Sequence, residues 1–295
     1  MNFCLLHCQL FSWKAIGITH KDNVPKDVWN LYFESENTKI TKNRINPDIS
    51  LSNDELFLFK CMFRGYITSG ISFSKNNTKI MHSECFFESC SSNIGAAVYI
   101  ENCDCSIVQH RFCSHNCTAS VQGQHSRCFM KTESTECLNY IDESSACECG
   151  KSSGYSLFSH AYGKIRFSSI NVSKNIGSFN VALNTRSQNF ENLNYSTIES
   201  NNASSYRMIG LGNGYTYNFE NCNILNNFQE SSNFGVIGLE GQLTLNGCSI
   251  LGDHGKGKIF YINKNSNVTV KNSFYDELTT NDIGCPKVRL AQRSI

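Results

Sequence analysis

The side chains most able to do chemistry lie between positions 103 and 117, where thiol and imidazole groups recur every few residues. Structural zinc sites use paired Cys and His ligands at such short spacings. On an extended strand, which advances about 3.3 Å per residue, these groups would spread along about 45 Å unless a turn gathered them. Stacked structural cysteines are therefore the preferred interpretation, with disulfides and a zinc site as alternatives, and we assign no metal ligand. The run comprises Cys103, Asp104, Cys105, His110, Cys113, His115 and Cys117, and Cys137, Cys147 and Cys149 follow it.

A second candidate is the glycine-rich segment 252–258, which contains Asp253 and His254. It has a faint similarity to the His-Gly and basic motifs of polygalacturonases. Polysaccharide cleavage needs two converging carboxyl groups, or a calcium-binding Asp cluster beside Arg or Lys. The nine Asp residues are scattered along the chain, so Asp253 has no evident partner and the segment is interpreted as a turn. We assign no catalytic or cofactor-binding residue, and we interpret residues 210–214 (Gly-Leu-Gly-Asn-Gly) as a loop between repeats.

Composition argues against two classes of partner. With 26 Lys and Arg against 25 Asp and Glu, the net charge is +1 and no basic block is present, so neither nucleic acid nor an anionic membrane is expected. The longest near-apolar run, residues 94–100, is far shorter than the roughly 18 residues of a membrane span. Asn (35) and Ser (37) supply about a quarter of the 295 residues, so we expect neutral amide and hydroxyl groups on the surface.

The pattern of breakers and propensities predicts an all-β protein. Only three prolines occur, and residues 48–285 contain none, although turns ordinarily recruit this residue. Frequent Asn, Ser and Gly with β-branched and aromatic residues between them lower the helix propensity throughout. We therefore expect almost no helix between residues 48 and 285.

An apolar or aromatic residue recurs at intervals of 24 to 31 residues along most of the chain. Core-type residues follow most of these positions two and five residues later, and the change of parity requires a corner or bulge between two short strands. A third apolar run often follows. Two or three strands per turn of about 26 residues predict a parallel β-helix of about nine coils, with a β-sandwich as the alternative. The starting positions are Leu56, Ile80, Ile107, Leu138, Ile165, Phe190, Tyr217, Leu243 and Val268.

Because equivalent positions of adjacent coils stack, the repeat also predicts which cysteines are neighbours. Cys61 should lie beside Cys85, Cys90 beside Cys117, and Cys222 beside Cys248. The coil that starts at Leu138 fits least well, because it places Glu143 inward. We therefore expect an outward insertion in residues 119–137. For the stacked cysteines we expect buried free thiols more often than disulfides.

The repeat divides the chain into three parts. Residues 55–276 form the β-helix, and residues 277–295 form a C-terminal tail. Residues 1–54 depart from the repeat and carry both tryptophans, Trp13 and Trp29. We expect them to form a short irregular N-terminal cap, since the unpaired strand edges of an open end invite aggregation.

Short motifs within the repeat resemble those of a known group of proteins. Residues 85–90 (Cys-Phe-Phe-Glu-Ser-Cys) and 95–100 (Gly-Ala-Ala-Val-Tyr-Ile) resemble the FxxN and GGA[IVL] repeats of polymorphic outer-membrane-type β-helix proteins, with Phe87 to Cys90 in place of FxxN. Residues 221–227 are similar, and the Asn-, Ser- and Cys-rich style resembles the β-helix surface proteins of parasitic protists of the trichomonad type. The resemblance covers about residues 55–276 and implies a single-stranded right-handed parallel β-helix (solenoid).

These observations favour a non-enzymatic surface or secreted protein that offers a long face for adhesion or recognition, with a host-cell or glycan surface as partner. The alternatives are a polysaccharide-active enzyme of the pectin lyase-like fold and a purely structural stalk or fragment. We expect no cofactor and no transmembrane segment in this chain, and an extracellular or cell-surface location. No feature of the sequence indicates the oligomeric state or the identity of the ligand.

Overall fold

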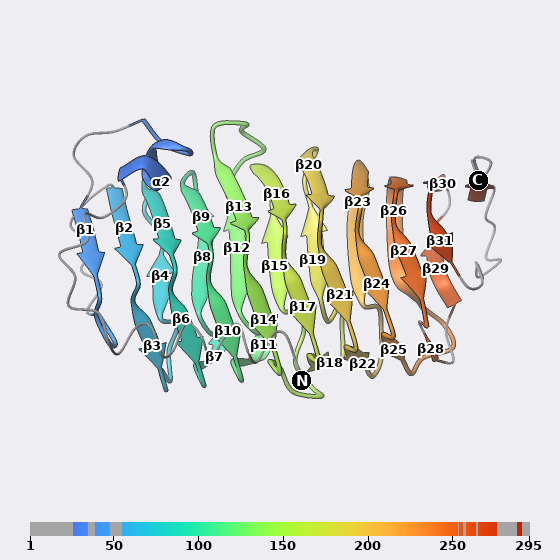
Figure 1. Cartoon of the computed structure of the whole chain (residues 1–295), viewed down its shortest axis with the longest axis horizontal. Helices are drawn as coiled ribbons and strands as arrows, with labels where there is room; N and C mark the ends of the chain where they lie inside the picture. Colours follow the sequence, from blue (N-terminus) through green and yellow to red (C-terminus); the bar gives the residue numbers. More distant parts are fainter. Residues whose placement is uncertain are drawn as a thin grey trace.

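The computed structural model describes residues 26–34, 39–47, 55–252, 254–255, 258–263, 265–275 and 288–290. Its strands lie side by side along one long axis and form parallel sheets (Figure 1). The fold is an all-β parallel solenoid of about eight turns, and within the described ranges α2 (Lys26–Asn30) is the only helix. The predicted fold class and the near absence of helix are therefore confirmed.

Each full coil contributes strands to three rows, which are named here in chain order. The first row contains β4 (Ile71–Phe73), β8 (Val98–Cys103), β12 (Ser126–Met130), β15 (Phe158–Ala161), β19 (Leu183–Arg186), the first parts of β23 (Ile209–Glu220) and β26 (Gly235–Asn246), and β29 (Lys258–Ile262). The second row contains β1 (Lys39–Lys42), β2 (Glu55–Phe59), β5 (Lys79–Ser83), β9 (Ser106–His110), β13 (Leu138–Asp142), β16 (Lys164–Ser168), β20 (Asn189–Asn194), the second parts of β23 and β26, β30 (Asn267–Lys271) and β32 (Val288–Leu290).

The third row is a separate nine-stranded sheet, and short strands follow it at the last corner of the coil. The third row contains β3 (Met62–Arg64), β6 (Phe86–Glu88), β10 (Cys113–His115), β14 (Ser145–Cys147), β17 (Asn171–Ser173), β21 (Thr197–Glu199), β24 (Asn223–Leu225), β27 (Ser249–Leu251) and β31 (Phe274–Tyr275). The short strands are β7 (Ser91–Ile94), β11 (Thr118–Gln122), β18 (Ile176–Gly177), β22 (Asn202–Ala203), β25 (Phe228–Gln229) and β28 (His254–Gly255).

The predicted register holds in most coils. Leu56 pairs with Ile80, which pairs with Ile107, and near the other end Tyr217 pairs with Leu243. Inward side chains of the three rows form one continuous core that runs the length of the solenoid. The first-row strand β15 and the start of β23 were not predicted from the sequence.

Two coils are shifted by one residue from the prediction. Ile107 pairs with Asn139, so Leu138 is not the first inward residue of its coil. Glu143, which was expected to point inward, lies at the corner and pairs with Arg111 at 2.6 Å, while the hydroxyl of Ser144 is buried and accepts a hydrogen bond from the backbone N–H of Phe112.

The second shift has a local cause. A bulge opposite residues 165–166 inserts one residue into β20, so Leu193 rather than Asn192 pairs with Phe167. The buried hydroxyl of Ser196, not the exposed Tyr195, then continues the inward ladder. The predicted insertion is also shorter than residues 119–137, because most of β11 and all of β12 lie within this range; the loop between β12 and β13 protrudes at the top of Figure 1.

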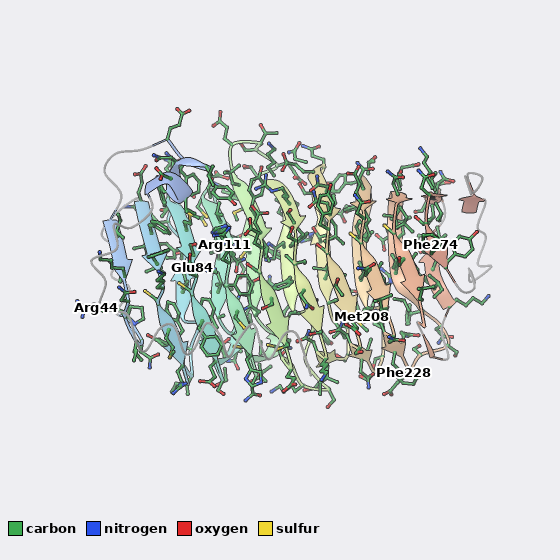
Figure 2. All side chains as sticks on the ribbon, in the orientation of Figure 1. Arg44, Glu84, Arg111, Met208, Phe228 and Phe274 are labelled. Carbon is green, nitrogen blue, oxygen red and sulfur yellow. The ribbon has the colours of Figure 1, made fainter. Side chains whose placement is uncertain are left out.

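A single left-handed residue makes the predicted corner between the second and third rows. Its φ lies between 47° and 67° in nine successive coils. Opposite charges alternate along part of this corner, where Lys60 lies 3.8 Å from Glu84 and Arg111 pairs with Glu143; Figure 2 labels Glu84 and Arg111. The corner therefore turns the chain without breaking the stack. Its residues are Lys60, Glu84, Arg111, Glu143, Ser169, Tyr195, Asn221, Gly247 and Asn272.

A ladder of buried asparagines follows the second corner, after the third row. The Nδ2 of Asn175 donates to Oδ1 of Asn201 at 2.9 Å, and Nδ2 of Asn201 donates to Oδ1 of Asn227 at 2.9 Å. Each Oδ1 also accepts a backbone N–H of the preceding coil, as Asn175 does from Cys149 at 2.9 Å. The ladder satisfies backbone groups that the corner would leave unpaired. In the earlier coils Cys90, Cys117 and Cys149 occupy the same position.

Helix α2 lies on the outer face of the second row, beside the first coils (Figure 1). Trp29 packs 5.9 Å from the ring of Phe57 in β2, and Tyr32 donates a hydrogen bond to Asp142 in β13, three strands further along the row, at 2.8 Å. Strand β1 pairs in parallel with β2, and β32 pairs with β30, so described parts of residues 1–54 and 277–295 extend the second row at each end. Trp13 lies outside the described residues.

Candidate anion-binding groove

The cysteine and histidine groups of segment 103–117 are distributed over different faces. Cys103 and Cys105 are buried with their sulfur atoms 2.9 Å apart, whereas His115 lies at the outer surface, 3.2 Å from Glu148. Cys113 packs outside the third row with Met62 and Phe86. In the part of the chain that the structure describes, no group of three or more His, Cys, Asp or Glu side chains can hold a metal ion. The structure therefore does not assemble the zinc alternative.

The three predicted cysteine pairs are neighbours in adjacent coils. All six residues, Cys61, Cys85, Cys90, Cys117, Cys222 and Cys248, are buried free thiols. The Cys248 thiol and burial together raise the pKa of the Cys222 thiol, and Cys117 and burial do the same for Cys90. Cys222 and Cys90 therefore retain the thiol form at neutral pH, as expected for side chains that serve as small core residues.

Segment 252–258 contributes no site that can be evaluated, because Asp253 lies outside the described residues. The backbone of His254 and Gly255 forms β28. Residues 210–212, interpreted above as part of a loop, instead lie in strand β23; only Asn213 and Gly214 make a left-handed turn, with φ of 66° and 72°.

Gly210 and Gly212 line a groove of about 390 Å³ on the outer face of the first row. The groove crosses β12, β15, β19, β23 and β26, which at about 4.8 Å per step spans about 19 Å. Gly210 and Gly238 are in register in adjacent strands, and each leaves room on the outer face for a side chain that lies over it. A Cβ on Gly210 would come within 2.6 Å of the Asn180 side chain, and a Cβ on Gly238 would lie 1.9 Å from Cδ of Arg207.

Arg207 lies in the groove without a counter-ion. Its side chain is only 5% exposed, and its guanidinium carbon lies 4.5 Å from the ring centroid of Tyr206 and 4.9 Å from that of Tyr261. Among the described residues, no carboxylate pairs with this guanidinium and no group accepts a hydrogen bond from it; its Nε is buried and unpartnered. Met208, the next residue along the chain, is labelled in Figure 2. The cation is therefore held by ring faces alone.

Two further arginines line the groove at lower-numbered coils. The guanidinium of Arg186 lies 5.1 Å from the ring of Tyr162 and 5.3 Å from that of Phe129, and it too has no ion pair or hydrogen bond among the described residues. Arg127 lies 4.0 Å from the same Phe129 ring, but Glu101 pairs with it at 2.7 Å. Two of the three guanidinium groups are therefore uncompensated.

Aromatic rings form a row from coil to coil along one side of the groove. Successive ring centroids are 3.8 to 5.3 Å apart, and Phe179 and Tyr206 are stacked with an angle of 4° between their planes. Phe179 and Tyr206, the two rings of the row that line the groove, cover one face of each other, so each stabilises the row with a face that is then not free for stacking. The row comprises Tyr155, Phe179, Tyr206, Phe234 and Tyr261.

Neutral polar groups complete the lining. The amide of Gln122 donates to the hydroxyl of Ser159 at 2.6 Å, and Asn180 donates to Asn184 at 3.1 Å. Oδ1 of Asn180 is buried and has no partner. Burial lowers the pKa of His160 to about 3, so this imidazole adds no charge at neutral pH. Of the described residues that line the groove, Glu240 is the only one with a carboxylate, against three arginines.

The three arginines could not be predicted from the repeat, because they share no repeat position. Arg127 and Arg186 lie on the outer face of strands β12 and β19, whereas Arg207 precedes β23. The one available signal was the recurrence of glycine at outward positions of two adjacent coils, Gly210 and Gly238, where a strand normally carries a side chain.

Comparison with known proteins identifies no relative: no protein-family model matches the chain, and no curated protein or solved structure is significantly similar to it. In the described residues, no helix has the length and apolar character needed to cross a bilayer.

Proposed function

We propose that the protein is a non-enzymatic surface or secreted recognition module that binds a glycan chain in the groove across β12 to β26. The observation that carries this proposal is the hollowed outer face, where amide, hydroxyl and guanidinium groups from successive coils line one continuous depression. Ligand sites combine apolar walls with a few placed polar groups, and sugar hydroxyls require donors and acceptors of this kind. A solenoid suits an extended ligand because each coil repeats the spacing of the last.

The resemblance to β-helix surface proteins of parasitic protists supports the same proposal. Its FxxN motif has a structural meaning here, since the first residue of the motif packs in the core and the fourth occupies the position of the asparagine ladder. Phe87 and Cys90 hold these places in one coil, and Ile224 and Asn227 in another. The motif therefore reports the architecture, and membership of that group, like the extracellular location, is part of the proposal.

A non-enzymatic role is supported by the lining of the groove. Glycoside hydrolysis uses a pair of carboxyl groups on either side of the scissile bond. Among the described lining residues Glu240 has no second carboxylate opposite it.

The test measures binding of the folded protein to a glycan array. It compares the wild type with a variant in which a bulky side chain fills the groove. Gly212 lines the groove, and a Cβ there would lie 3.7 Å from Cβ of Arg186, an ordinary contact. Gly212→Phe should therefore fold normally, place a ring in the groove and abolish glycan binding. Asn223→Phe, at an exposed position of the third row, is the matched control and should bind normally.

Two outcomes would contradict the proposal. Failure of the wild-type protein to bind any glycan would favour the structural-stalk alternative. Release of reducing ends or unsaturated products from polyuronates, with or without calcium, would favour the polysaccharide-active enzyme.

A further inference from the structure

We propose that the groove selects anionic glycans, whose carboxylate or sulfate groups bind between Arg186 and Arg207. This inference rests on the proposed glycan-binding function and names the class of ligand. It is carried by the two guanidinium groups that line the groove without a counter-ion.

Arg207 is largely buried, and its Nε has no hydrogen-bond partner among the described residues. Removing a charge from water is unfavourable, and buried charges are normally paired or fully hydrogen-bonded. Arg207 is 5% exposed, yet among the described residues its guanidinium makes cation–π contacts with aromatic rings, including Tyr206 and Tyr261, and no ion pair or hydrogen bond. A guanidinium presents five N–H donors in a planar fork that matches carboxylate and sulfate oxygens. An anion in the groove would supply the missing acceptors.

The glycines maintain this arrangement. The side chain of Arg207 crosses onto the next coil and lies over Gly238, where any Cβ would overlap its Cδ. Gly210, the partner of Gly238 in the adjacent strand, leaves room for Asn180. Glycine weakens a strand, but at these two paired outward positions it leaves the room that the Asn180 and Arg207 side chains occupy.

The surroundings favour a glycan over a single-stranded nucleic acid, which also carries repeated anions. Proteins that bind single strands offer free aromatic faces on which bases stack. Here neighbouring rings or guanidinium groups cover the faces of Phe179, Tyr206 and Phe129. The groups that remain free are hydrogen-bond donors and acceptors, which suit a hydroxylated, charged chain.

The experiment measures affinities for four probes by calorimetry: a galacturonate oligosaccharide, a heparin-type sulfated oligosaccharide, a neutral malto-oligosaccharide of equal length, and single-stranded DNA. We expect at least one anionic glycan to bind about tenfold or more tightly than the neutral one. Arg186→Gln and Arg207→Gln should each remove most of this preference, and added salt should weaken it. Arg64→Gln, at an exposed arginine of the third row, is the matched control and should leave it unchanged.

A second variant separates the role of Arg207 in binding from its role in stability. Gly238→Ala keeps the guanidinium group of Arg207 but displaces it, so the affinity for anionic glycans should fall. The urea midpoint of Gly238→Ala should differ less from that of the wild type than the midpoint of Arg207→Gln does. Comparison of the uronate and sulfate probes identifies which anion the fork accepts.

Each remaining outcome is decisive. Equal affinity for neutral and anionic glycans would overturn the anionic preference and leave the proposed function intact. Binding of no glycan would overturn both, and tighter arginine-dependent binding of DNA than of any glycan would assign the groove to nucleic acid.

Discussion

Replacement of Asn201 by Ala tests whether the asparagine ladder stabilises the solenoid. The Asn201 side chain makes four buried hydrogen bonds: it donates to Asn227 at 2.9 Å and to the carbonyl of Val172 at 3.0 Å, and it accepts from the backbone and side-chain N–H groups of Asn175, each at 2.9 Å. A typical buried hydrogen bond contributes about 1 kcal/mol net, and an orphaned buried donor costs about 1–3 kcal/mol. The backbone N–H of Asn175 would be orphaned. We therefore expect a loss of about 3–5 kcal/mol in the free energy of unfolding.

The assay is urea denaturation followed by circular dichroism, combined with hydrogen exchange at the Asn175 amide. Asn223→Ala is the control, because Asn223 is exposed on the outer face of β24 and should change stability by less than about 0.5 kcal/mol. Faster exchange confined to the coils on either side of Asn201 would agree with the nearest-neighbour character of a solenoid. A cost for Asn201→Ala within error of that for Asn223→Ala would refute the ladder as a source of stability.

Three further predictions concern the core and the corners. Burial lowers the pKa of His82 and His160 to about 3 from 6.5. The stability that depends on their neutral forms is therefore present above about pH 6.5 and lost as the pH falls toward 3. Urea titrations should show that the free energy of unfolding falls by about 2 kcal/mol per histidine between pH 7 and 5, and His160→Gln should make this fall smaller. Cys222 and Cys248 should react slowly with thiol reagents in the folded protein, and alanine at either position should cost about 1–2 kcal/mol through the cavity it leaves; rapid labelling of both would contradict the register. Tyr195, 66% exposed with a φ of 49°, should be replaceable by Asn with a gain of about 0.5–1 kcal/mol, since Asn tolerates the left-handed conformation; a loss of stability in urea would show that the tyrosine ring packs usefully.

The repeat was predictable because the core selects side chains by position. Strand residues alternate between faces, so every coil must place an apolar or small residue at equivalent points, and Ile80, Ile107 and Leu243 were identified in this way. The same logic predicted the corner and the cysteine neighbours. It failed by one residue at Leu138 and Asn192, where a longer loop and a bulge change the count without changing the composition.

The groove was not predictable by that logic, since outward positions obey no periodic constraint. Arg127, Arg186 and Arg207 come from three different places in their coils, and only the folded chain brings them onto one face. A repeat search also treats an outward glycine as a turn residue. Gly210 was misinterpreted in this way, although it lies in a strand and faces Gly238.

The stacked residues of the ladders stabilise the solenoid, whereas features of the groove destabilise it. Stacked asparagines, cysteines and apolar residues gain from each added coil, so the core can tolerate local defects on its outer face. The outer face of β23 and β26 concentrates such defects: two glycines that weaken the strands, and the buried guanidinium of Arg207, which has no counter-ion among the described residues. Their coincidence at one depression, rather than their scatter over several faces, is the physical reason to assign the depression a ligand.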